Sequence, residues 1–161
     1  MTRAYFLGNG FGQSYYQKRS LTEDFGNHGY GRIIQIGSAA NPNPLPDRAA
    51  YSAAKAALAN LSVSLAKELA ATGVTANTIS PGPTRTAGFR ELTARFAAGH
   101  GLPDVESATR ILLDGPLAAP SDRLAEPAEI AALVAFVASP YGASINGANL
   151  RIDGGLTPTV N

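Results

Sequence analysis

The chain has 161 residues, of which 45% are hydrophobic and 16% charged, and this balance is typical of one globular domain. Thirteen basic residues face twelve acidic ones, so no excess charge is available to neutralise a nucleic-acid backbone. The sequence has no Cys and only two His, which excludes a disulfide framework, a thiol nucleophile and an ordinary zinc site. It also lacks an apolar run of about 18 residues and a signal-peptide pattern, so we expect a cytoplasmic protein with no nucleic-acid, membrane or metal partner.

The first 30 residues differ in composition from the rest of the chain. They hold seven of the twelve Phe and Tyr residues but a single Ala, whereas Ala is abundant afterwards. We therefore divide the chain into an irregular N-terminal segment, 1–30, and a structured region, 31–161. Within the first segment, Gly8-Asn9-Gly10-Phe11-Gly12 superficially suggests a dinucleotide-binding turn, but its third glycine is misplaced and a poor helix follows.

The next elements predict a βαβ unit. Residues 32–38 form a short β-branched run that predicts a buried parallel strand, and the Pro-rich stretch 40–47 predicts a loop. Apolar residues at intervals of three and four predict a helix over about 49–72, with Gly73 as its stop. Residues 74–80 predict a second strand, ended by Pro81-Gly82-Pro83. This order of strand, helix and strand predicts a parallel sheet.

The remaining elements complete an α/β pattern. Weaker helical patterns over 87–98 and about 104–114 predict a small helical flap, of a kind that often closes over ligands. A Pro at the first helical position and an apolar series predict a helix over 127–138. Residues 148–152 predict a last short strand. The sequence therefore predicts about three parallel strands with flanking helices, and the first strand is expected to leave an open edge.

Three residues carry candidate chemistry. Tyr51 and Lys55 are four residues apart on the long predicted helix, so their side chains share one face. An ammonium close to a phenol favours the phenolate and lowers a phenol pKa of about 10, which supplies a general acid and base. Ser38 ends the preceding strand, where ligands of parallel sheets bind, and its hydroxyl could hold a substrate oxygen. Taken alone, however, a Tyr and a Lys at this spacing are also ordinary residues of an amphipathic helix.

Four separated motifs give these residues a context. In chain order they are GRIIQIGS (31–38), YSAAKAAL (51–58), VTANTISPGPTRT (74–86) and NGANLRIDGG (146–155). Together, over residues 31–157, they resemble the C-terminal half of the short-chain dehydrogenase/reductase (SDR) family, and they look most like its bacterial ketoacyl carrier-protein reductases. The resemblance implies an α/β fold that is the C-terminal half of a Rossmann-like, doubly wound parallel sheet.

The resemblance also implies a function and a role for each matched residue. The function is NAD(P)-dependent hydride transfer between nicotinamide and a carbonyl or secondary alcohol. Tyr51 would exchange a proton with the substrate oxygen, Lys55 would support Tyr51 and hold the nicotinamide ribose, and Ser38 would polarise the substrate oxygen. The full set of implied cofactor contacts is Tyr51, Lys55, Pro81, Gly82, Thr84 and Thr86. The flap would line the substrate pocket with Phe89, Leu92, Phe96, Leu112 and Leu113.

Other motif residues are expected to be structural. We expect Asn77 to anchor the local backbone and Asp153 to form a turn outside the site. Gly37 departs from the frequent Ser-Ser pair of the family, and because the second Ser carries the implied role, we expect this departure to be minor.

The larger departure lies before residue 31, where the family's glycine-rich phosphate-binding turn is expected. Nothing in residues 1–30 matches it, so we expect a truncated catalytic region that could have lost cofactor binding, and the sequence does not distinguish NAD from NADP. A displaced reading frame over the first 30 residues is one hypothesis. Two functions stay open: an active, homo-oligomeric oxidoreductase of a small-molecule carbonyl or alcohol, or an inactive fragment that acts only through self-association or association with an intact relative.

Overall fold

The computed structural model describes residues 4–6, 29–46 and 48–159 of the chain. The glycine motif at residues 8–12 and His28 lie outside the described residues. The described part contains one sheet of four parallel strands in the order β1-β2-β3-β4. These strands are β1 (Ala4–Phe6), β2 (Gly31–Ile36), β3 (Val74–Pro81) and β4 (Asn149–Ile152).

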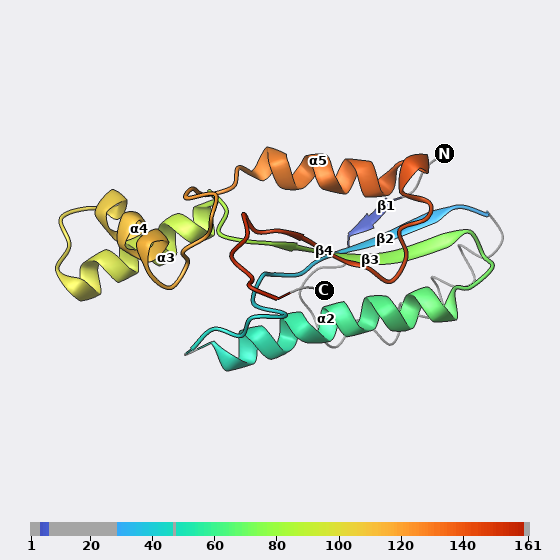
Figure 1. The fold of residues 1–161 in the computed structure, drawn as a ribbon, viewed down its shortest axis with the longest axis horizontal. Coiled ribbons are helices and arrows are strands. Elements are labelled where there is room, and N and C mark those ends of the chain that lie inside the picture. Colours follow the sequence, from blue (N-terminus) through green and yellow to red (C-terminus); the bar gives the residue numbers. More distant parts are fainter. Residues whose placement is uncertain (1–3, 7–28, 47, 160–161) are drawn as a thin grey trace.

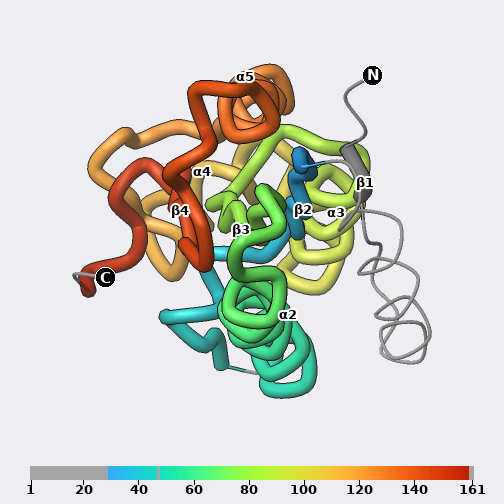
Figure 2. Tube along the Cα trace, turned by 90° about the vertical axis from the view of Figure 1, so that its right-hand side faces the viewer, coloured from blue at the N-terminus to red at the C-terminus, as the bar shows by residue number. Residues whose placement is uncertain are grey.

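Helices cover both faces of the sheet (Figure 1). Helix α2 (Ala49–Glu68) lies on one face and α5 (Pro127–Ala138) on the other, with the strands between them in the end-on view of Figure 2. Helices α3 (Ala87–His100) and α4 (Val105–Asp114) form the predicted flap beyond the end of β3, and a 3-10 turn, η1 (Pro140–Gly142), follows α5. The predicted α/β fold is confirmed, and its three predicted strands are β2, β3 and β4.

The period of two along the strands explains this layering. In β2, Ile33 and Ile34 point to opposite faces, as neighbouring residues of a strand must. Ile33 belongs to the core under α2, and Ile34 belongs to the core under α5. The α2 core consists of Ile33, Leu65, Leu69, Val74 and Ala76, and the α5 core consists of Ile34, Ile79 and Val137 with partly buried neighbours. No helix of the described residues is long and apolar enough to cross a membrane.

Two expectations are corrected by the structure. The first concerns the edge of β2, which was expected to be open. In the structure β1 pairs with this edge in parallel, from Ala4↔Arg32 to Phe6↔Ile34. The second concerns the end of the long helix, which stops at Glu68 and not near Thr72. Ala71 adopts a left-handed backbone with φ 64°, and the Thr72 hydroxyl donates to the Leu69 carbonyl at 2.6 Å, so a local turn replaces the last helical turn.

The buried Asn77 of β3 anchors backbone, as predicted. Its Nδ2 donates to the Ile145 carbonyl at 2.7 Å, and its Oδ1 accepts the Ala148 N–H at 3.0 Å. Asn146 adds a third link, because its Oδ1 accepts the Ala76 N–H at 2.9 Å. These bonds hold the segment before β4 against β3 and thereby set the register of the last strand.

Candidate active site

The candidate catalytic side chains lie at the carboxyl end of β2. Ser38 lies two residues after the end of β2, and Tyr51 and Lys55 lie in the first turns of α2. The Lys55 Nζ donates to the Ile36 carbonyl oxygen at 2.9 Å and lies 5.8 Å from the centre of the Tyr51 ring. The strand end and the helix start are therefore joined through the lysine, and the three residues converge on one place.

Burial distinguishes the three side chains. Lys55 is buried, with 8% of its surface exposed, whereas Tyr51 is 43% exposed. Burial lowers the pKa of Lys55 below its ordinary value, because the charged ammonium loses water contacts. The Ser38 Oγ accepts the Ala40 N–H at 3.1 Å, which leaves the hydroxyl proton to donate elsewhere.

Two cavities meet at this place. One, of about 610 Å³, is lined by all seven residues that the sequence predicts for the site: Ser38, Tyr51, Lys55, Pro81, Gly82, Thr84 and Thr86. The other, of about 430 Å³, lies under the flap and shares Ser38, Tyr51, Pro81 and Gly82 with the first. Of the flap residues expected in a substrate pocket, Phe89, Leu92, Phe96 and Leu112 line this second cavity, whereas Leu113 is buried elsewhere.

Two of the predicted cofactor residues also hold local structure. The Thr84 hydroxyl donates to the Gly82 carbonyl at 2.9 Å, and the Thr86 hydroxyl caps α3 by accepting the Phe89 N–H at 3.2 Å. The cap explains why α3 begins at Ala87.

Glycines 37 and 82 permit close approaches that a side chain would block. A Cβ at Gly37 would lie 2.7 Å from the Nδ2 of Asn41 and from the Oγ of Ser80, and this Nδ2 donates to this Oγ at 2.9 Å. The departure from the Ser-Ser pair therefore has a structural reason in this chain. A Cβ at Gly82 would lie 2.7 Å from the Cα of Asp153, where the end of β4 passes the end of β3.

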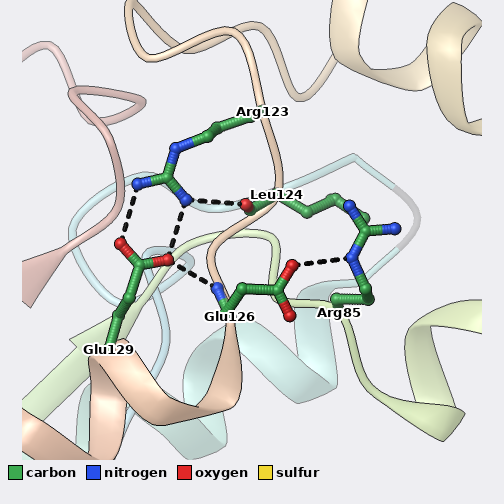
Figure 3. Close-up of polar contacts among 5 residues, drawn as sticks. All are labelled: Arg85, Arg123, Leu124, Glu126 and Glu129. Atoms are coloured by element: carbon green, nitrogen blue, oxygen red, sulfur yellow. Dashed lines mark hydrogen bonds and ion pairs between the residues drawn. The ribbon is translucent and has the colours of Figure 1, made fainter.

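Ion pairs fasten the base of the flap to α5 (Figure 3). Arg123 binds Glu129 through two hydrogen bonds of 2.7 Å, and Arg85 pairs with Glu126 at 2.8 Å. The pairing with Arg123, together with the N–H of Glu126, lowers the pKa of Glu129 to about 2. Two backbone hydrogen bonds join the same segments. The Arg85 N–H donates to the Ala125 carbonyl, and the Ala125 N–H donates to the Pro83 carbonyl, both at 2.9 Å. The entry and exit of the flap are thus held side by side above α5.

The turn at Asp153 is present as predicted, and Asp153 is absent from the residues that line the two cavities. Its carboxylate accepts the N–H groups of Gly155 at 3.1 Å and Thr157 at 3.0 Å. Partial burial opposes ionisation of this carboxyl, but these hydrogen bonds and the nearby charge of Arg151 outweigh it, so the pKa of Asp153 lies below its ordinary value.

The substitution Asp153→Asn tests this turn. We expect the free energy of unfolding to fall by about 1 kcal/mol at pH 7, because Asn keeps only one, uncharged, acceptor oxygen and its NH2 group cannot accept the second N–H. A carboxylate whose pKa is lower in the folded chain than in the unfolded chain stabilises the fold. This stabilisation is fully present above the pKa of the unfolded chain, about 3.9, and is lost as the pH falls through the pKa of the folded chain. Urea unfolding at pH 7 and near pH 3 measures this difference, and an equal difference at both values contradicts the assignment.

Sequence reasoning missed part of the cavity walls. The first cavity is closed on one side by α5, through Pro127, Ile130, Ala131, Val134 and Ala135. The second includes loop residues Asn43, Leu45, Pro46 and Arg48 and the later residues Pro116, Leu117 and Leu156. The apolar pattern of 127–138 predicts the helix but gives no sign of which residues face a cavity and which face the sheet.

Known proteins share both the sequence and the fold. The family profile described as Enoyl-(Acyl carrier protein) reductase matches residues 14–157. The chain is 39% identical over 130 residues to "Uncharacterized oxidoreductase YvaG" of Bacillus subtilis (strain 168), covering 81% of this chain and 49% of that protein. It is 36% identical over 156 residues to the 3-oxoacyl-[acyl-carrier-protein] reductase FabG of Haemophilus influenzae, covering 97% of this chain and 54% of that protein. The chain thus spans about half the length of these relatives.

A solved structure agrees with these matches. The L-sorbose reductase of Gluconobacter frateurii, solved in complex with NADPH and L-sorbose, superposes with a TM-score of 0.84 at 27% sequence identity, covering 93% of this chain and 56% of that one. The fold, the family profile and the relatives agree with the resemblance that the four motifs suggested, and the chain belongs to the short-chain dehydrogenase/reductase family of oxidoreductases.

Proposed function

We propose that this chain forms the catalytic region of an NAD(P)-dependent oxidoreductase that transfers hydride between nicotinamide and a carbonyl or secondary alcohol. One observation carries the proposal: Ser38, Tyr51, Pro81 and Gly82 line both cavities. A cofactor in the first cavity and a substrate in the second would therefore meet beside the Tyr51 phenol and the Ser38 hydroxyl.

Tyr51 and Ser38 would act on the substrate oxygen. The half-exposed phenol of Tyr51 can reach a ligand and donate its proton to a carbonyl oxygen that gains negative charge. Ser38 would donate a second hydrogen bond to the same oxygen, since its Oγ already accepts from Ala40 and its proton points away from that bond. In the reverse direction, Tyr51 would take the proton from the alcohol.

Lys55 would support the phenol and bind cofactor. Its ammonium donates to the Ile36 carbonyl at 2.9 Å and lies 5.8 Å from the centre of the Tyr51 ring, so its positive charge would stabilise the negative charge that develops during proton transfer. Ammonium groups carry three donors, and hydroxyl groups of the nicotinamide ribose are suitable acceptors in the same cavity.

The first cavity has the chemical character that a nicotinamide needs. Its wall on α5 is apolar, from Ile130 to Ala135, and suits the face of a flat ring. Pro81 and Gly82 would bound the ring, and the backbone and hydroxyls at Thr84 and Thr86 would meet the carboxamide. When bound, the reduced nicotinamide supplies the hydride.

A titration with reduced nicotinamides tests the proposal. Because the chain spans about half of its relatives, the probes are NADH, NADPH and the smaller reduced nicotinamide mononucleotide, followed by nicotinamide fluorescence. We expect saturable binding that weakens at least about tenfold in Lys55→Met, which keeps the aliphatic stem but removes a charged donor.

The matched control is Lys67→Met, which removes an exposed lysine from the last turn of the same helix and is expected to bind like the parent chain. Binding that requires Lys55 would exclude the alternative of an inactive chain that acts only by association. No binding at millimolar concentrations of any probe contradicts the proposed function and supports that alternative.

We propose further that the protein is a cytoplasmic homo-oligomer. In such an assembly a partner copy could cover exposed large apolar side chains, among them Val63 on α2, Phe136 on α5 and Tyr141 on η1.

A further inference from the structure

The cavity under the flap combines an apolar wall with a charged residue. Its lining is mostly apolar, with side chains from the loop before α2 and from α3 and α4. Among the described residues that line it, the only charged one is Arg48. A lone cation in an apolar pocket favours a ligand with an apolar body and one negative charge.

Arg48 lies close to the candidate catalytic residues. It is the N-cap residue of α2 and precedes Tyr51 by three positions, and both residues line the second cavity. Its side chain makes no capping bond, and the first turn of α2 has no acidic residue. Arg48 is exposed and contributes to the cavity wall, so its charge is available to a ligand there.

Four of the large apolar side chains in the wall come from the flap. Phe89, Leu92 and Phe96 come from one face of α3, and Leu112 comes from α4. Because α3 and α4 lie in the flap beyond the end of β3 (Figure 1), this apolar surface belongs to a different element from Arg48 and Tyr51. A ligand whose charge and carbonyl both bind near the start of α2 would extend its apolar tail toward the flap.

We propose that the second cavity selects oxo-carboxylates with an apolar tail, and that Arg48 binds the carboxylate within a few bonds of the carbonyl that Ser38 and Tyr51 hold. This substrate class rests on the proposed function, since the carbonyl position is taken from it. Arg48 is then a specificity residue: it distinguishes a free acid from an ester or thioester, which has no charge at that position.

The test compares 4-oxooctanoate with its methyl ester, in which a methyl group replaces the negative charge. Titration of the ¹⁵N-labelled chain, followed by NMR without cofactor, gives both dissociation constants. We expect the acid to bind about fivefold more tightly than the ester, a modest factor because Arg48 is exposed, and we expect the preference to shrink at 0.5 M salt.

Three variants make the result specific. Arg48→Gln is expected to abolish the preference for the acid, Arg48→Lys to keep most of it, and Arg90→Gln, an exposed arginine of α3 outside the cavity wall, to leave it unchanged. Equal binding of acid and ester to the parent chain, or a preference that survives Arg48→Gln, overturns the proposal. Since the readout needs neither nicotinamide nor turnover, failure of the proposed function appears in the nicotinamide titration and failure of this proposal appears here.

Discussion

Replacing Tyr51 by Phe is expected to reduce turnover at least about 100-fold while leaving nicotinamide binding unchanged, because the substitution removes only the transferable proton. The ring that contributes to both cavity walls is kept, and the Lys55 ammonium stays bonded to the Ile36 carbonyl. The measurement is the steady-state rate of nicotinamide oxidation with a carbonyl substrate, together with the fluorescence titration described above.

A matched control is available in Tyr141, which is 85% exposed on η1 and lines neither cavity. Tyr141→Phe makes the same chemical change far from the candidate site and is expected to keep the parent rate. A Tyr51→Phe variant that retains most of the activity refutes Tyr51 as the acid. A variant that loses activity and nicotinamide binding together assigns the Tyr51 hydroxyl to cofactor binding instead.

The sequence predicts which residues gather at the candidate site, because each of them lies in a short motif at a strand end or near the start of a helix. Ser38 ends a strand, Tyr51 and Lys55 share a helix face, and Pro81-Gly82 ends the next strand. In a parallel sheet, the carboxyl ends of neighbouring strands meet at one edge. These local signals are sufficient to bring all seven predicted residues to one cavity.

The walls of the cavities are harder to predict, because they depend on contacts between distant segments. Ile130 and Val134 are read from sequence as core residues of a helix, and they do pack against the α5 core, yet the same helix also closes the first cavity. Arg48 stands between the Pro-rich stretch 40–47 and α2, where no periodic pattern marks it, and only the folded position of the flap relative to α2 makes it part of a pocket.

Local geometry also explains the details in which the structure differs from the predictions made from the sequence. A helical pattern continues past Glu68 in the sequence, but the left-handed Ala71 and the Thr72 hydroxyl end the helix earlier. The pairing of β1 with β2 has no strong sequence signal, since three residues are too few to show a period of two.

Replacing Gly82 by Ala is expected to destabilise the chain by about 1–3 kcal/mol, the usual cost of forcing a methyl group into a packed site. The new Cβ would lie 2.7 Å from the Cα of Asp153 and 3.0 Å from its carbonyl oxygen. Both are backbone atoms, so a side-chain rotation cannot relieve the overlap. The strands must separate instead, which stretches the 3.0 Å bond from the Gly82 N–H to the Ile152 carbonyl.

The opposite result is expected at Gly99, a helical glycine of α3 around which a Cβ would meet no atom within 4 Å. Gly99→Ala removes the conformational freedom of glycine from the unfolded chain and should stabilise the fold by up to about 1 kcal/mol. Urea unfolding of both variants measures the two changes. If Gly82→Ala were as stable as the parent, β3 and β4 would have to tolerate a methyl group between them. The close approach of the Asp153 backbone would then not explain why a glycine stands at position 82. The role of Gly82 would have to be sought in the cavity that it lines.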